Sequence, residues 1–193
     1  MKRILYAFFC LSLFLSSGLY AQDHQGVSFG IRILAGGRYD NVRMCVGSPA
    51  GVPGGPIGEV YFDIRVPVSE SGNVVINVPL FRPIMFAAAF DMLQFEPAVM
   101  YEHSFGEEDE TQPVVGAGLG IILHHGPDYN SSREDRGESF FSVGPLLNGF
   151  AGVKIAETNL TVGVKGFFSP LFTPDRSTGV VAGGGLDLQY HFD

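Results

Sequence analysis

Residues 180–192, VVAGGGLDLQYHF, decide the fold expected of this chain. In the second half of the stretch, apolar and polar side chains alternate: Leu186, Leu188, Tyr190 and Phe192 fall on one face, and Asp187, Gln189 and His191 on the other. Successive side chains of a β-strand point to opposite faces, so one face of this strand requires apolar surroundings and the other polar ones. The stretch therefore predicts a strand in a sheet whose two faces meet different environments.

Similar segments recur along the chain. The clearest is 58–68, where Val60, Phe62 and Ile64 alternate with acidic and basic residues. Six more segments have comparable patterns: 26–35, 74–80, 92–103, 114–123, 140–155 and 160–168. With the C-terminal strand they predict eight strands, joined by short and long connections that largely alternate.

Three places depart from this pattern. Pro97 lies inside the fourth segment and cannot donate to a ladder, which predicts a bulge or a strand shift there. Gly144-Pro145 is expected to break the sixth segment, which follows the long polar loop expected over 124–139. The apolar region 81–91 either extends its neighbouring strands or forms a short helix.

The N-terminus has the features of a secretory signal. Lys2 and Arg3 precede an apolar run over residues 4–15, and small residues lead to Ala21, the expected last residue of the signal. Residues 1–21 are thus predicted to be a signal peptide and 22–193 a single barrel domain. Cys10 falls inside the apolar run, which leaves Cys45 as the only cysteine of the mature chain and excludes an intrachain disulfide.

The composition narrows the class of protein further. The net charge of −8 disfavours nucleic acid as a partner. Hydrophobic residues make up 46% of the chain and charged residues 17%, yet no apolar run beyond the signal is long enough to span a bilayer as a helix. A membrane protein without membrane helices must span as a closed barrel, because every backbone polar group in lipid needs a partner. The alternative is a soluble exported barrel of lipocalin type that binds a ligand in an apolar interior.

We therefore expect an all-β fold, an eight-stranded antiparallel up-and-down transmembrane β-barrel. If the apolar faces point to lipid, the opposite faces bring charged residues of both signs into the interior. Because an eight-stranded barrel is only wide enough for its side chains to fill, these charges should form ion pairs and not a wide pore. The predicted interior polar network consists of Arg32, Glu59, Asp63, Arg65, Glu96, Glu102, Lys154, Lys165 and Asp187.

Three stretches carry a resemblance to a known group of proteins. Residues 95–102 (FEPAVMYE), the glycine-alternating segment 115–123 and the C-terminal strand through Tyr190 and Phe192 resemble small bacterial outer-membrane barrels of the OmpX/OmpW-like kind. The resemblance implies export to the bacterial outer membrane, where the barrel assembly machinery recognises an aromatic C-terminal strand; here Asp193 follows Phe192. It implies either the passage of small hydrophobic molecules sideways into the membrane, as in OmpW-like proteins, or a surface interaction, as in OmpX-like proteins.

Other chemistry in the sequence is weak. Adjacent strand residues point to opposite sides, so His124 and His125 cannot chelate one metal in regular geometry and are interpreted as a polar rim pair. His103 and Ser104 are adjacent, which does not match the one-residue spacing of lipid-modifying barrels. We expect no catalytic site, no metal and no cofactor. The expected partners are membrane lipid, the assembly machinery, and a small hydrophobic solute or a surface ligand.

Overall fold

The computed structural model describes residues 26–41, 54–107, 109–129, 136–174 and 178–192. The predicted signal peptide, with Cys10, and the single mature cysteine, Cys45, lie outside these residues, as does most of the connection 41–54.

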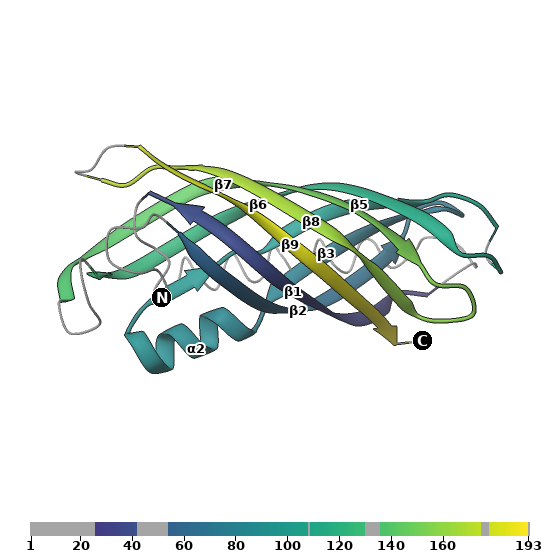
Figure 1. The fold of residues 1–193 in the computed structure, drawn as a ribbon, viewed down its shortest axis with the longest axis horizontal. Coiled ribbons are helices and arrows are strands. Elements are labelled where there is room, and N and C mark those ends of the chain that lie inside the picture. The colour runs from purple at the N-terminus through teal and green to yellow at the C-terminus, as the bar shows by residue number, and fades with distance from the viewer. Residues whose placement is uncertain (1–25, 42–53, 108, 130–135, 175–177, 193) are drawn as a thin grey trace, which may run out of the picture.

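Nine antiparallel strands and one helix make up the described fold (Figure 1). The strands are β1 (Ser28–Asp40), β2 (Gly55–Pro67), β3 (Gly72–Pro79), β4 (Leu93–Phe95), β5 (Ala98–Ser104), β6 (Gln112–Tyr129), β7 (Arg136–Lys154), β8 (Leu160–Leu171) and β9 (Gly179–Phe192), and helix α2 (Phe81–Phe90) follows β3. The strand order is β4-β6-β5-β3-β2-β1-β9-β8-β7, and β6 also pairs with β7. This last pairing closes the sheet into a barrel.

The barrel wall has eight strands, because β4 and β5 are two pieces of one. Both pair with β6, and only Glu96 and Pro97 separate them. The carbonyl of Pro97 still accepts a hydrogen bond from Ile121 N at 3.1 Å. The predicted eight-stranded antiparallel barrel is therefore confirmed, and the expected irregularity at Pro97 is an interruption of the fourth wall strand.

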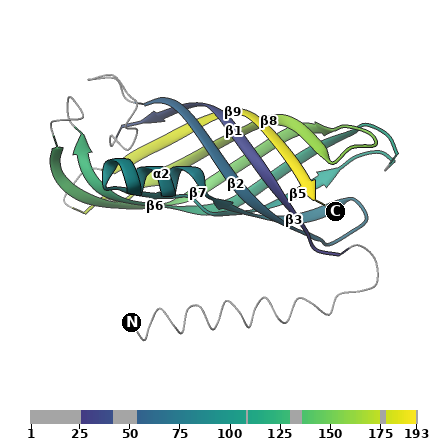
Figure 2. The ribbon, with the colours of Figure 1, turned by 90° about the horizontal axis from the view of Figure 1, so that it is seen from below.

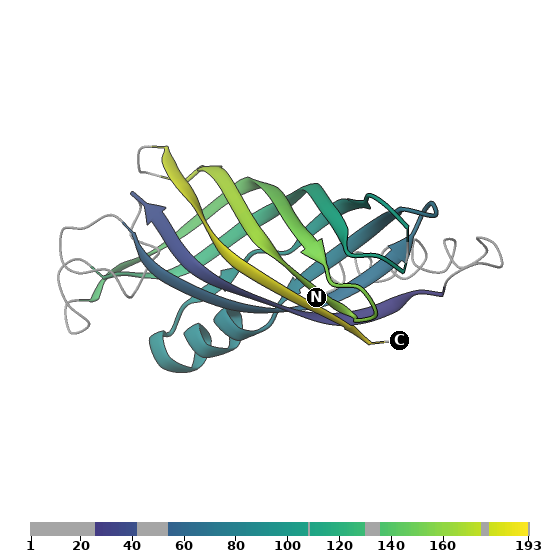
Figure 3. The same ribbon diagram turned by 45° about the vertical axis from the view of Figure 1, so that its right-hand side comes forward.

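The first and last strands lie side by side and complete the closure (Figure 3). In their register Gly36 lies opposite Gly185, and a Cβ added at either residue would run into the backbone of the other strand. The GGG run of the C-terminal stretch thus lets β9 approach β1 more closely than side-chain-bearing residues allow.

The two ends of the barrel differ. One end, called the turn end here, has the short connections 68–71, 105–111 and 155–159, with Ser28 and Phe192 nearby. The other, the loop end, has the connections 41–54, 80–92, 130–135 and 172–178. This is the alternation that the sequence predicts.

The expected assignment of faces is confirmed. The outer surface carries exposed apolar side chains on every side, among them Leu186 (69% exposed), Leu119 (65%) and Val164 (56%), while charged residues such as Lys165 of β8 and Asp187 of β9 are buried inside. This arrangement is the reverse of a lipocalin-type barrel, whose apolar side chains would point inward.

Several strand boundaries differ from the predicted ones. Strand β6 continues to Tyr129 and β7 begins at Arg136, so most of the expected loop 124–139 is a long hairpin. β7 also runs without a break through Gly144-Pro145, where Pro145 pairs with Ile121. At Pro145 the proline removes one hydrogen-bond donor from the ladder without ending β7. In β6, polar residues that point inward, such as His124, made the end of the strand look like a polar loop.

Helix α2 closes a gap in the wall. The β2–β3 ladder covers only Tyr61–Pro67 of β2, so on that side the loop-end part of β2, 55–60, has no strand partner among the described residues. β4 likewise pairs only with β6. Helix α2 lies in this half of the barrel and contacts both β2 and β4 (Figure 2). The open question about 81–91 is thus answered by a helix, and no helix in the described part of the chain is long and apolar enough to cross a membrane.

Candidate functional site

The middle of the barrel is filled by a group of ion-paired side chains, called the central network: Arg32, Asp63, Arg65, Asn77, Glu102, Lys165, Asp187 and Gln189. Arg32 is its centre. Its Nε lies 3.3 Å from Asp63 Oδ2 and 3.4 Å from Asp187 Oδ1, and its Nη2 donates to Glu102. All four of these residues are almost fully buried.

Neutral partners complete the central network. Asn77 accepts from Arg32 Nη1 at 3.2 Å and from Lys165 Nζ at 3.4 Å, and it donates to Asp63 Oδ1 at 2.7 Å. Lys165 Nζ lies 4.4 Å from the ring centre of Tyr61, and the Arg32 guanidinium 5.4 Å from that of Phe150. Buried charges need this density of partners, because each unpaired charge in a dry interior is costly.

A second cluster, called the helix anchor, lies nearer the loop end: Arg38, Glu59, Arg82, Gln94 and Glu96. Arg82 projects inward from α2 and donates to both carboxylate oxygens of Glu96, at 3.1 and 3.2 Å, and to Gln94 Oε1 at 2.7 Å. Arg38 Nη1 donates to Glu96 Oε1 at 2.7 Å. Glu96 thus joins β1 to the helix through two guanidinium groups.

Glu59 fastens the first turn of the helix. The N-cap residue, Leu80, has no side chain that could accept a hydrogen bond. Instead Glu59 Oε1, on β2, accepts from the backbone N–H of Arg82 at 3.0 Å. A carboxylate at this position satisfies an unpaired helix donor and also interacts favourably with the helix dipole.

Beside the helix anchor, the loop-end interior contains an apolar cluster, which the expected polar interior did not include. Buried residues of β6 to β9 form one apolar cluster: Ile122, Phe140, Leu146, Leu171 and Val181. These residues alternate with outward residues that are also apolar, so the sequence does not mark an inside face in these segments.

His124 and Ser142 lie opposite each other on β6 and β7, and both are fully buried. Ser142 Oγ is 2.7 Å from Thr173 Oγ1, while neither ring nitrogen of His124 has a hydrogen-bond partner in the described structure. His124 therefore lies inside the barrel and not on a polar rim, although it does point away from its exposed neighbour His125 as predicted. No described group of three His, Cys, Asp or Glu residues could hold a metal ion.

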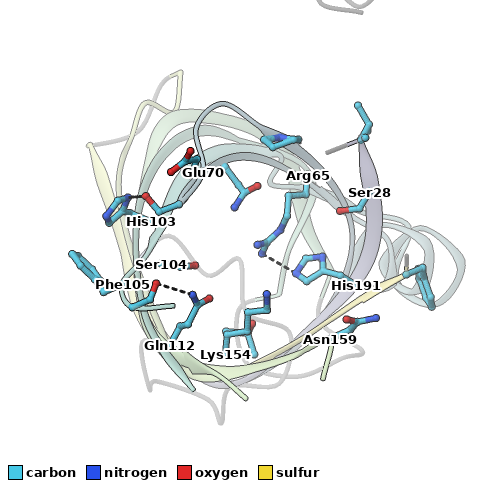
Figure 4. A pocket seen from close by; sticks show the side chains of 18 residues that line it. Ser28, Arg65, Glu70, His103, Ser104, Phe105, Gln112, Lys154, Asn159 and His191 are labelled. Atoms are coloured by element: carbon cyan, nitrogen blue, oxygen red, sulfur yellow. Dashed lines mark hydrogen bonds between the residues drawn. The ribbon is translucent and has the colours of Figure 1, made fainter. Parts of the chain in front are cut away.

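A cavity of about 1010 Å³ opens at the turn end (Figure 4). Arg65, Lys154 and His191 reach into it from β2, β7 and β9; Gln112, which pairs with Lys154, lies beside that lysine, and His103 lines the wall on the side away from His191. Arg65 Nη2 is 2.9 Å from Glu102 Oε2 and 2.8 Å from His191 Nε2, so the central network forms the floor of this cavity.

The nine residues predicted for the interior network divide among these three regions. Arg32, Asp63, Arg65, Glu102, Lys165 and Asp187 belong to the central network, Glu59 and Glu96 belong to the helix anchor, and Lys154 is half-buried at the turn-end cavity. The prediction missed Arg38 and Asp40 because the first predicted strand stops at residue 35. In the structure β1 continues to Asp40, and both residues lie at even-numbered inward positions like Arg32. Arg82 had no periodic signal, since it belongs to the helix.

The residues predicted to serve as an assembly signal lie at the outer surface. Tyr190 and Phe192 are 48% and 46% exposed at the turn end of β9, with ring centres 5.4 Å apart. Their recognition by an assembly machinery stays a prediction.

Comparison with known proteins supports the fold. No protein family matches the chain, and no curated protein sequence matches it. Among solved structures, the crystal structure of Neisserial surface protein A is similar, with a TM-score of 0.50 and 12% identity over 87% of this chain and 100% of that one. The N-terminal β-barrel domain of Pseudomonas aeruginosa OprF has a TM-score of 0.39 and 12% identity over 84% of this chain and 97% of that one. The likeness to the first confirms the expected barrel fold.

Proposed function

We propose that this chain is an integral protein of the bacterial outer membrane, with its apolar outer surface against lipid. The observation that carries the proposal is the division of faces around a closed barrel: apolar side chains outside, ion-paired charges inside. Closure leaves no unpaired sheet edge along most of the wall, which is the requirement for spanning lipid with strands.

Aromatic side chains support this placement. Phe29, Tyr101, Phe105, Tyr190 and Phe192 are all exposed near the turn end. Transmembrane barrels carry such aromatic girdles where the apolar band meets the headgroups. Since these barrels have short turns in the periplasm and longer loops outside, the turn end would face the periplasm.

The test is labelling of single cysteines placed on a Cys45→Ser background. Cysteines at Leu119, Val164 and Leu186 should react with a lipid-phase maleimide in reconstituted vesicles and resist a water-soluble one. A cysteine in place of Met100, which is fully buried inside, is the matched control and should resist the lipid-phase reagent. Fast reaction of all three outer positions with the water-soluble reagent would favour a soluble barrel.

A second candidate function is the sideways release of small hydrophobic molecules. The central network fills the cross-section, so a molecule that enters from the loop end has no straight path across the barrel. The wall between β2 and β4 is closed by a helix and not by a ladder, and the outer face of that helix is apolar, with Ile84 68% exposed. Displacement of α2 from the gap between β2 and β4 would connect the apolar cluster at the loop end to the lipid.

Release of the helix tests this second function. Arg82→Met removes the side chain that ties α2 to Glu96, and it should speed the transfer of a hydrophobic dye into the bilayer of reconstituted vesicles. Arg136→Met, at the start of β7, removes one positive charge elsewhere and should leave transfer unchanged. If vesicles with the parent protein and vesicles with Arg82→Met both transfer the dye no faster than protein-free vesicles, the result would count against a lateral route.

A further inference from the structure

Two positive residues, Arg65 and Lys154, and one negative residue, Glu70, line the cavity at the turn end. Below it, the central network is balanced, with three positive residues, Arg32, Arg65 and Lys165, and three negative ones, Asp63, Glu102 and Asp187. Lys154 adds one more positive charge from β7, and no described carboxylate forms an ion pair with it. Glu70, the carboxylate among the lining residues, is exposed on the turn between β2 and β3.

The two cations point toward one another across the cavity. Figure 4 shows the ends of the Arg65 and Lys154 side chains directed to its centre, with His191 beside Arg65. Like charges that converge in a confined space repel, and the nearest carboxylate, Glu102, already accepts from both Arg32 and Arg65. An anion between Arg65 and Lys154 would remove this repulsion.

The Arg65 guanidinium is held in place but not saturated. One nitrogen, Nη2, makes the contacts to Glu102 and to His191 Nε2, while Nη1 makes no hydrogen bond within the described residues and the side chain is 15% exposed. His191 is itself only 8% exposed, so the guanidinium is fixed against a rigid floor. A fixed guanidinium with free N–H groups suits the oxygens of a phosphate or a carboxylate, and a lysine adds a mobile second charge.

We infer that the turn-end cavity is a binding site for an oxyanion, the phosphate or carboxylate group of a solute, held between Arg65 and Lys154. The cavity is large enough for a solute bigger than the anion itself. The same chemistry is offered by a free anionic solute and by the headgroup of an anionic lipid. That the ligand would arrive from the periplasm rests on the proposed function; the site itself does not.

The lysines of the chain provide a direct readout. Lys154 and Lys165 are the only lysines after residue 2. Protein labelled with ¹³C at the lysine Cε, purified in a non-ionic detergent, is titrated with inorganic phosphate against chloride at constant ionic strength. The Lys154 resonance should shift saturably, while Lys165, buried in the central network, should stay in place. A Lys154 resonance that does not move, or that moves linearly with either salt, would overturn the site.

A matched pair of variants separates a site from a general effect of charge. Binding of phosphate, followed by ³¹P line broadening, should weaken about tenfold in Lys154→Gln, which loses one charge-assisted contact. Arg136→Gln loses the same charge at the loop end and should bind as the parent protein does. Equal weakening in the two variants would contradict the inference.

Nanodiscs distinguish the two sources of the anion. In phosphatidylcholine nanodiscs, a saturable shift of Lys154 on addition of phosphate identifies a free solute. A shift that appears with phosphatidylglycerol nanodiscs before any phosphate is added identifies a lipid headgroup. If the Lys154 resonance shifts in neither experiment, the site is rejected. Because the detergent titration needs no membrane, its outcome is independent of the cysteine labelling that tests the outer-membrane location.

Discussion

The central network and the helix anchor use the same chemistry for different purposes. Both consist of buried arginines paired with carboxylates, but the first lies where hydrogen-bonded strands surround it on all sides, and the second lies beside the gap between β2 and β4. Charges in the middle fill a space that the ladders already enclose. Charges at the gap hold in place a helix that no ladder supports. Loss of a pair should therefore destabilise the whole barrel in the first case and release one segment in the second.

Charge reversal should have the largest effect. Glu96→Arg would place a third positive charge between Arg38 and Arg82, and Arg65→Glu would put a carboxylate beside Glu102. Both should prevent refolding, measured as the loss of the heat-modifiable band on gels, because buried like charges cannot be relieved by solvent. Arg133→Glu, in the connection between β6 and β7, is the control and should refold normally. Equal tolerance at all three positions would contradict the assignment of faces.

Neutralising the centre should cost somewhat less. Arg32→Met removes the common partner of Asp63, Glu102 and Asp187 and should lower the free energy of unfolding by about 3–5 kcal/mol. Urea unfolding in lipid vesicles, followed by tyrosine fluorescence, measures this change. An unfolding midpoint equal to that of the parent protein would mean that water or ions replace Arg32 without cost.

Arg82→Met should act locally. We expect a loss of about 2 kcal/mol, since Glu96 keeps its contact to Arg38, and the loss should be concentrated in α2. Hydrogen exchange should accelerate at the α2 amides and stay slow in β1 and β9. Acceleration throughout the barrel would show that the anchor and the central network form a single cooperative unit, which would end the contrast between them.

The smallest change concerns the helix cap. Glu59→Gln keeps an acceptor for the Arg82 N–H but removes the negative charge beside the helix N-terminus. We expect a loss of about 0.5–1 kcal/mol, again confined to α2. Exchange of the first-turn amides measures it, and Glu70→Gln, on an exposed turn, provides the control that should leave these amides unaffected. A larger loss than that of Arg82→Met would indicate that Glu59, and not Glu96, is the main attachment of the helix.

Alternation along the chain was enough to predict the barrel, its eight wall strands and the inward position of residues such as Arg32 and Asp187. The reason is that successive side chains of a strand point to opposite faces, so odd-numbered and even-numbered residues separate onto two sides. In most strands of this chain one of these two sets is apolar and the other is polar or charged. Strand lengths were predicted less well. Where both faces of a segment are apolar or rich in glycine, as in 114–129, parity marks no boundary, and the hairpin partner decides how far the strand continues.

The amino-acid sequence by itself determined which side chains share a face, because that relation is local and repeats every two residues. Only the tertiary structure decided which charges meet, since Arg32 and Asp187 become neighbours through the β1–β9 closure, and Arg82 reaches Glu96 only where β3 stops short of the loop end. Register, curvature and the early end of one strand are properties of the closed barrel as a whole. For the same reason, the helix in the wall and the converging cations of the turn-end cavity become visible only after the strands have been placed around a common axis.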